Sequence, residues 1–322
     1  MSKIILQVEE LRTSFFTRKG EVKAVDGVSF HVHEGETFGI VGESACGKTV
    51  TGLSILRLLP EPAGRIVGGK IILEGTNLLE LSKKEMRAIR GRMISMILQD
   101  PMTSLNPVYT IGDQIAESVR LHQGLSDSGV EQEVISALRL VKIPSPEMIL
   151  RQHPFELSGG MRQRVVGAIA MSCHPHLLIA DEPTTALDAT IQAQYLALFK
   201  EVQQKTNVAI IFITHDFGVV ANMCHRVGVM YAGKIVETAS TRELFKAPKH
   251  PYTTALIHSV PRLDRKDDRL YSIEGQPPSM MNLPPGCRFL PRCSVALEVC
   301  GEQEPPEMEI GNGHSISCWR VK

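Results

Sequence analysis

An eight-residue segment has the residue types and spacing of a phosphate-binding loop. It consists of Gly42, Glu43, Ser44, Ala45, Cys46, Gly47, Lys48 and Thr49. Backbone N–H groups in such a glycine-bounded loop point toward phosphate oxygens, and the N-terminus of the helix that follows favours the same anions. The lysine would reach the outer phosphates and the threonine hydroxyl would ligate Mg²⁺. Because an eight-residue pattern also arises by chance, the rest of the sequence has to support it.

Polar residues that end three other apolar runs extend this chemistry. The run 177–182 ends in Asp181 and Glu182, and two further runs end at Gln99 and His215. Ends of strands commonly line the ligand crevice of open α/β sheets. There an aspartate can hold Mg²⁺, and a glutamate can act as general base toward an attacking water. We expect His215 to be catalytic rather than structural.

A second possible anion site lies at Ser158, Gly159 and Gly160, before a predicted helix over residues 161–172. Serine is a good N-cap, and the two glycines would leave backbone N–H groups available at the start of this helix. Without the phosphate-binding loop, the two glycines would be interpreted as a simple turn.

We expect an α/β fold of the P-loop NTPase type to position these residues. Apolar runs predict strands, a polar turn carrying two aromatics is expected over residues 11–20, and proline-punctuated helical patterns fill residues 103–156. The predicted strands cover residues 4–8, 38–41, 68–75, 93–98, 177–182 and 208–213, with a final hairpin over 226–237. Ser82 with Glu85 has the spacing of a capping box that starts a short helix.

The composition excludes several classes of protein. The 322 residues suit one large domain plus an extension, and 35 Lys plus Arg balance 35 Asp plus Glu, so global charge does not indicate nucleic-acid binding. The N-terminal apolar run is too short for a signal peptide, and no run approaches the roughly 18 residues of a membrane span. We therefore expect a cytosolic chain whose cysteines are thiols or metal ligands.

In their order along the chain, these motifs resemble the ATP-binding subunits of ABC transporters. The resemblance also includes Leu157 and Met161, which flank the serine–glycine motif, and the segment Ala186, Leu187 and Asp188. It implies an ATPase domain over residues 1–240 with an antiparallel β subdomain and a helical subdomain at about 101–162. A small cysteine-rich extension would occupy residues 241–322.

The resemblance also implies a composite ATP site. Residues 42–49, Gln99, Asp181, Glu182 and His215 would hold one ATP, with Thr49, Gln99 and Asp181 on Mg²⁺. Residues 158–160 would complete the ATP site of a second subunit, and Asp188 would lie at the dimer seam. Phe15 would stack on adenine, with Phe16 as the alternative.

Three residues depart from the usual family pattern: Ala45, Cys46 and Met161 stand where glycine, serine and glutamine are common. None of the three removes a phosphate-binding N–H group. Because Cys46 is close to Lys48 and to a helix N-terminus, we expect a lowered thiol pKa. An alkylating reagent would then label Cys46 unless ATP and Mg²⁺ protect it.

The extension narrows the resemblance to the ATPases of oligopeptide, dipeptide and nickel uptake. The residues that carry it are His250, Pro251 and Tyr252, together with the segment 99–107. It implies a second related ATPase subunit, two permease subunits and an extracytoplasmic substrate-binding protein, at the cytoplasmic face of the membrane and without nucleic acid. The cargo stays open among dipeptides, oligopeptides, nickel chelates and glutathione. A soluble non-transport ABC protein is the alternative from another class.

Four of the seven cysteines cluster near the end of the chain: Cys287, Cys293, Cys300 and Cys318. These cysteines include no Cys-x₂-Cys pair, which weakens the case for Zn²⁺ as the metal that they bind. Four thiolates suit a [4Fe–4S] cluster, and the resemblance to peptide-transporter ATPases with a cysteine-rich tail favours the same group. Arg288 and Arg292 would offset the charge of this structural cluster, and His314 could substitute as a ligand.

Overall fold

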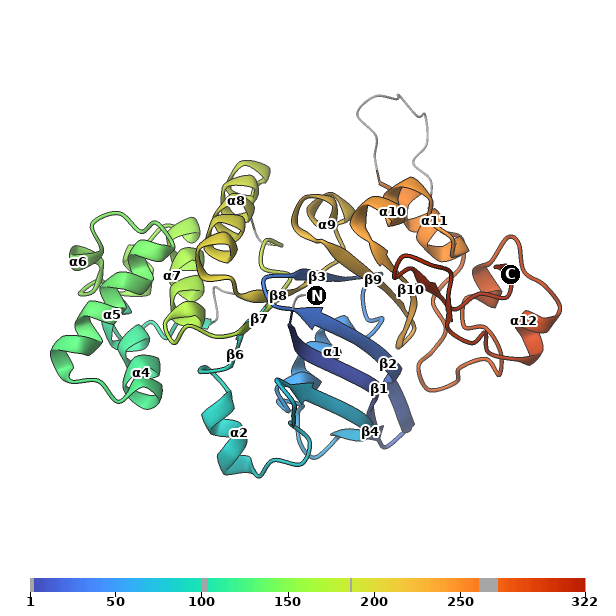
Figure 1. Cartoon of the computed structure of the whole chain (residues 1–322), viewed down its shortest axis with the longest axis horizontal. Coiled ribbons are helices and arrows are strands. Elements are labelled where there is room, and N and C mark those ends of the chain that lie inside the picture. Colours follow the sequence, from blue (N-terminus) through green and yellow to red (C-terminus); the bar gives the residue numbers. More distant parts are fainter. Residues whose placement is uncertain (1–2, 100–103, 186, 261–271, 322) are drawn as a thin grey trace. The chain divides into compact units, whose positions relative to one another are not determined.

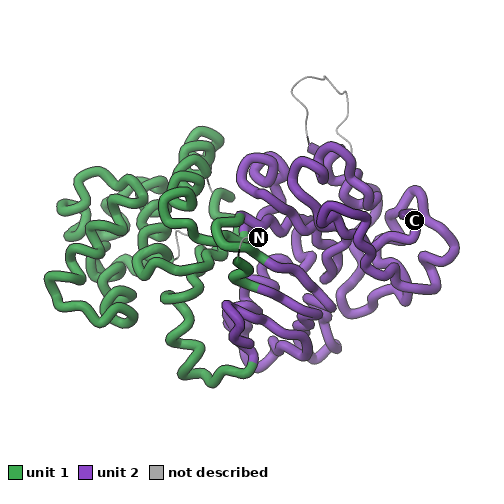
Figure 2. Tube along the Cα trace, viewed as in Figure 1, with its two compact units in different colours: residues 1–6, 32–36, 80–211 green, residues 7–31, 37–79, 212–322 purple. Residues whose placement is uncertain are grey.

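The computed structural model describes residues 3–99, 104–185, 187–260 and 272–321. The chain folds into two compact units, each assembled from separate stretches of sequence (Figure 2). Unit 1 contains residues 1–6, 32–36 and 80–211, and unit 2 contains residues 7–31, 37–79 and 212–322. The predicted motif residues 100–103 and Ala186 lie outside the described residues.

A four-stranded sheet with the strand order β2-β1-β4-β5 lies largely in unit 2. Its strands are β1 (Ile4–Thr17), β2 (Gly20–His33), β4 (Gly64–Leu73) and β5 (Thr76–Asn77). The predicted polar turn over residues 11–20 is wrong, because β1 continues to Thr17. Thr13 and Ser14 are buried within it, and the Thr13 hydroxyl lies 2.8 Å from the Ser54 hydroxyl. Buried polar side chains that find a partner are compatible with a strand.

In unit 2, neighbouring strands of the second sheet follow the order β11-β12-β10-β9-β3. Its strands are β3 (Thr37–Val41), β9 (Arg226–Tyr231), β10 (Lys234–Ser240), β11 (Met308–Glu309) and β12 (Ser315–Ile316). The fully buried β3 pairs in parallel with β9, and β9 and β10 form the predicted antiparallel hairpin. Because β12 pairs with β10, the cysteine-rich end of the chain continues this sheet.

The described residues of unit 2 contain six helical segments, most of them labelled in Figure 1. They are α1 (Lys48–Ile55), α9 (Phe217–Met223), α10 (Thr241–Lys246), α11 (Pro251–His258), the 3₁₀ turn η2 (Leu290–Arg292) and α12 (Val299–Glu302). Helix α9 packs on β3, and α10 packs on β9 and β10. The phosphate-binding loop thus lies between a buried strand and α1, as the sequence predicts.

Unit 1 combines parallel strands with a helical subdomain. Strand β6 (Ile94–Ile97) pairs in parallel with β7 (Leu177–Asp181), and β8 (Ala209–Thr214) starts in this unit with Ala209 N–H donating to the His176 carbonyl. The helical segments are α2 (Lys83–Ile89), α4 (Ile111–Gln123), α5 (Asp127–Leu140), α6 (Pro146–Ile149), η1 (Pro154–Glu156), α7 (Gly159–Met171) and α8 (Ala189–Thr206). Helix α5 packs on α4, α6 and α7 (Figure 1).

Both predicted serine caps are present. Ser82 accepts from Glu85 N–H while the Glu85 carboxylate accepts from Ser82 N–H, which completes the capping box of α2. Ser158 accepts from Met161 N–H at the start of α7. None of the helices in the described ranges combines the length and hydropathy that a bilayer span requires.

Candidate functional site

The phosphate-binding loop, residues 42–49, requires glycine at both ends. A Cβ on Gly42 would lie 2.1 Å from the Met230 carbonyl oxygen. Gly47 has φ of +112°, and a Cβ there would lie 2.3 Å from the Ala24 carbonyl oxygen. Backbone of the neighbouring strands therefore lies so close to the loop that only glycine fits at these two positions.

The Gly42→Ala variant is expected to lower the free energy of unfolding by about 1–3 kcal/mol, because the new Cβ meets backbone rather than a movable side chain. Urea unfolding followed by circular dichroism measures this loss. Gly159→Ala is the control, since a Cβ at Gly159 meets no atom within 4 Å and alanine is a good helix residue. Equal midpoints for the two variants would contradict the close approach at Gly42.

Lys48 is held inside the loop. Its ammonium donates to the carbonyl oxygens of Gly42, at 2.8 Å, and of Glu43, at 2.9 Å, and the residue is buried. Lys48 and Thr49 open α1, whose first N–H groups have no partner within the helix. The Lys48 ammonium and the N-terminus of α1 thus lie at the same loop, which suits a polyphosphate.

The structure contradicts the prediction for Cys46. This residue is only 5% exposed, and burial raises the pKa of its thiol despite Lys48 Nζ at 3.9 Å from Sγ. Its carbonyl accepts from Gly233 N–H, so the residue lies on the inner side of the loop. A buried, protonated thiol is a poor nucleophile, so an alkylating reagent should not label Cys46 readily, contrary to the prediction.

The other predicted residues of unit 2 lie at element ends. His215 is exposed and follows the last residue of β8, beside Asp216, which caps α9 by accepting from Gly218 and Val219 N–H groups. Phe15 is half-buried near the end of β1, whereas Phe16 is 45% exposed with the Arg65 guanidinium 5.5 Å from its ring centroid.

Unit 1 brings Gln99 and Glu182 together. Gln99 Nε2 donates to Glu182 Oε2 at 3.3 Å, and Thr185 Oγ1 donates to the same oxygen at 2.9 Å. Asp181 is buried at the end of β7, and Glu182 follows with φ of +44° in the left-handed region. Strained backbone of this kind persists where the neighbouring structure enforces it. In this conformation the Glu182 carboxylate accepts hydrogen bonds from Gln99 and Thr185.

Unit 1 also places the serine–glycine motif beside Asp188. Ser158, Gly159, Gly160 and Asp188 line one cavity, and Leu187 and Tyr195 contribute to its wall. Asp188 accepts from Thr190 and Ile191 N–H groups, both at 3.0 Å, and so caps α8. The cavity therefore presents the N-terminus of α7, which favours an anion, whereas the first N–H groups of α8 are already satisfied by the Asp188 carboxylate.

Sequence reasoning missed the contacts that the end of the chain makes with the phosphate-binding loop. The Arg292 guanidinium pairs with both oxygens of the Glu43 carboxylate, at 2.6 and 2.9 Å, and its side chain is 3% exposed. Tyr252 accepts through its hydroxyl from Glu43 N–H at 3.0 Å. The motif His250, Pro251 and Tyr252 carried the resemblance to peptide-transporter ATPases, but nothing in its spacing indicated a contact with Glu43.

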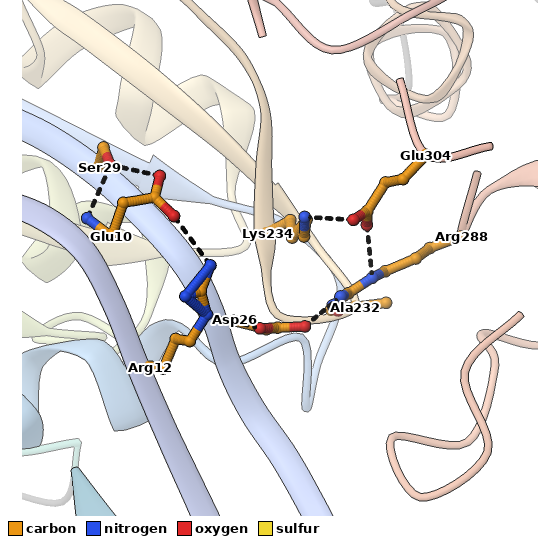
Figure 3. A network of polar contacts seen from close by, with 8 residues as sticks. All are labelled: Glu10, Arg12, Asp26, Ser29, Ala232, Lys234, Arg288 and Glu304. Atoms are coloured by element: carbon orange, nitrogen blue, oxygen red, sulfur yellow. Dashed lines mark hydrogen bonds and ion pairs between the residues drawn. The ribbon is translucent and has the colours of Figure 1, made fainter. Parts of the chain in front are cut away.

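Arg288 also has an acidic partner. Figure 3 shows its guanidinium between the Asp26 carboxylate, the Ala232 carbonyl and Glu304, which in turn pairs with Lys234. Burial would raise the pKa of Asp26, but the hydrogen bond and charge of Arg288 outweigh it and lower that pKa. Arg288 and Arg292 are thus committed to carboxylates, and the expectation that they offset the charge of a metal cluster is wrong.

The four clustered cysteines line a single cavity together with His250, Phe289 and Trp319. Burial raises the pKa of the Cys287 thiol to about 11, and the neighbouring Cys300, Cys318 and Cys293 add to this shift. Across the described residues, no group of three or more His, Cys, Asp or Glu side chains is arranged to hold a single metal ion.

His314 is engaged elsewhere. Its Nε2 lies 2.8 Å from Oε1 of the buried Glu237, which also accepts from the Lys249 and His250 N–H groups. Burial lowers the pKa of His250 to about 4, so its neutral ring accepts through Nδ1 from Tyr252 N–H. This network gives His314 a structural role rather than that of a substitute ligand.

Comparison with known proteins gives two family matches. The ABC transporter family matches residues 25–185, and the oligopeptide/dipeptide transporter C-terminal region matches residues 236–300. The dipeptide transport ATP-binding protein DppD of Bacillus subtilis is 51% identical over 315 residues, covering 98% of this chain and 94% of DppD. The oligopeptide transport ATP-binding protein OppD of the same organism is 50% identical over 316 residues, covering 98% of this chain and 88% of OppD.

Solved structures agree on the fold. The cbiO1 protein of Clostridium perfringens, part of the ABC transporter complex cbiONQ, superimposes with a TM-score of 0.66 at 25% identity, covering 76% of this chain and 92% of cbiO1. The ATP-binding cassette MJ0796 bound to ADP and Pi superimposes with a TM-score of 0.65 at 22% identity, covering 74% of this chain and 99% of the cassette. The predicted ABC ATPase fold is confirmed. The chain belongs to the oligopeptide/dipeptide branch of the ABC transporter family, as an ATP-binding subunit that hydrolyses ATP for peptide transport.

Proposed function

We propose that this chain energises the import of dipeptides or oligopeptides as one of two related ATPase subunits. Two permease subunits and an extracytoplasmic substrate-binding protein complete the assembly at the cytoplasmic face of the membrane. The main support is a phosphate-binding loop with Lys48 seated in it, in a chain that matches a dipeptide transport ATP-binding protein over 98% of its length.

The residues present fit ATP and Mg²⁺. Backbone N–H groups of residues 42–49 and the Lys48 ammonium would bind the phosphates, and Phe15 would stack on adenine. Thr49, Gln99 and Asp181 offer the oxygen ligands that Mg²⁺ prefers, and the bound ion would neutralise charge that develops on the phosphates.

The Glu182 carboxylate would accept a proton from the attacking water, with His215 as a further catalytic group. The hydrogen bonds from Gln99 and Thr185 restrain that carboxylate before substrate arrives. Residues 158–160 would bind the outer phosphate held by a second ATPase subunit, with Asp188 at the seam. Because such contacts exist only in a closed pair, ATP would favour closure and hydrolysis would release it.

Assembly tests this proposal. Coexpressed with the permease subunits and the second ATPase subunit, the tagged chain should purify as a complex whose ATPase rate rises when peptide-loaded binding protein is added. If the chain purifies alone and its ATPase rate does not change when peptide-loaded binding protein is added, the importer assignment is wrong. Stimulation by a nickel chelate or glutathione, and not by peptides, would reassign the cargo.

We further propose that Cys287, Cys293, Cys300 and Cys318 hold a structural [4Fe–4S] cluster. All four line one cavity with apolar walls. A zinc ion needs four ligands on one atom at about 2.3 Å for sulfur, whereas a [4Fe–4S] cluster takes one thiolate on each of four iron atoms. Four thiols gathered at one cavity supply the ligand set that such a cluster takes.

Anaerobically purified protein should be brown and contain about four iron atoms per chain. Cys293→Ser should lose most of this iron, while Cys173→Ser, which changes a buried cysteine of unit 1, should keep it. Metal analysis by mass spectrometry measures the iron and zinc content per chain. A colourless protein with about one zinc per chain would replace the cluster with a zinc site.

A further inference from the structure

Glu43 places a carboxylate directly after the first glycine of the phosphate-binding loop. Its backbone is held at both ends: its N–H donates to the Tyr252 hydroxyl, and its carbonyl accepts from Lys48 Nζ. The side chain is 27% exposed. An unpaired negative charge at this place would repel phosphate groups, since like charges at short range disfavour one another.

Arg292 neutralises this charge through contacts that use the whole guanidinium. Besides the two bonds to the Glu43 carboxylate, Nε donates to the Glu274 carbonyl at 3.1 Å, and Nη2 to the Ile273 carbonyl at 3.4 Å. Nη1 also lies 3.4 Å from the Tyr231 hydroxyl. A planar guanidinium whose three nitrogens all have partners is pre-organised for bidentate binding of a carboxylate.

The same part of the chain supports Tyr252. Phe289 contacts the rings of Tyr252 and Tyr231, with centroids 5.3 Å away in both pairs. Arg292 ends the turn η2, three residues after Phe289. The C-terminal extension thus contacts the backbone and the side chain of Glu43 through two adjoining groups within unit 2.

We infer that Arg292 is a positioning residue for nucleotide binding: by pairing with Glu43, it shapes the phosphate-binding loop and cancels a repulsive charge. The inference rests on the proposed ATP site. Through the contact between Arg292 and Glu43, the C-terminal extension contributes to the nucleotide site of its own chain. The extension also continues the sheet of unit 2. Arg292 acts through Glu43 and need not touch the nucleotide.

Fluorescent ATP analogue binding to the purified full-length chain tests the inference without the transporter. Arg292→Met should raise the dissociation constant on the order of 10- to 100-fold, because it leaves the half-buried Glu43 carboxylate unpaired near the phosphates. The double variant Arg292→Met with Glu43→Gln should return to within about threefold of the wild type, because the repulsive charge is gone. A purely structural role would not give this rescue.

Lys234→Met is the matched control. It removes a pairing with Glu304 of the same extension, at 2.7 Å, and leaves Glu43 untouched, so nucleotide affinity should not change. Where Arg292→Met fails to fold, Arg292→Lys keeps the charge without the fork and should weaken binding about 3- to 10-fold. Wild-type affinity in the arginine variants, or no rescue in the double variant, would overturn the inference. Failure of the wild-type chain to bind the analogue would instead refute the proposed site.

Discussion

Glu182→Gln should lower steady-state ATP hydrolysis about 100- to 10,000-fold, the usual contribution of a general base, while ATP affinity stays within about threefold. The glutamine keeps the shape of the side chain and can still contact Gln99 and Thr185, but it cannot take a proton from water. Phosphate release from the assembled transporter measures the rate, and equilibrium binding of ATP measures the affinity.

Glu201→Gln is the matched control, because it removes the same charge from a partly exposed residue of α8 that pairs with Lys142. Its hydrolysis rate should equal that of the wild type. Unchanged turnover in Glu182→Gln would mean that another group activates the water, and the role assigned to the end of β7 would then be wrong.

Lys48→Met should weaken ATP binding and reduce hydrolysis by about 100- to 1000-fold, comparable to the loss of a donor that stabilises a developing anion. The methionine keeps the buried stem, so the effect isolates the ammonium that now bonds the Gly42 and Glu43 carbonyls. The concentration dependence of hydrolysis separates the loss of affinity from the loss of rate.

Lys70→Met in the same unit is its control, since Lys70 is exposed and lies 3.7 Å from Glu9 on the sheet. Lys48→Met and Lys70→Met each remove one positive charge from unit 2. If both hydrolyse ATP with wild-type parameters, the loop does not bind phosphate through Lys48.

The parts of the site that local sequence determines were predictable. A glycine pattern after a buried strand specified the loop, because Gly42 and Gly47 are required by backbone that approaches them closely. Ser158 could be assigned as a cap because its hydrogen bond spans three residues. The run before Asp181 is apolar on every residue since β7 is buried on both faces, a local signature of a parallel sheet.

The parts that depend on distant packing were not predictable. Cys46 has the neighbours of a reactive thiol in sequence, but the chain near Met230 and Gly233 covers it and reverses the pKa shift. Arg292 and Glu43 are 249 positions apart. Only the fold shows that the arginine beside a cysteine cavity is the partner of the phosphate-binding loop.

Peptide uptake tests the central claim most directly. The chain is reconstituted in proteoliposomes with its permeases and partner ATPase subunit. Labelled dipeptide should accumulate when ATP is supplied on the side of the ATPase subunits and loaded binding protein on the other. Replacing ATP with ADP, or wild-type chain with Glu182→Gln, should abolish the accumulation. Uptake that proceeds equally with ADP or with the variant would contradict the account.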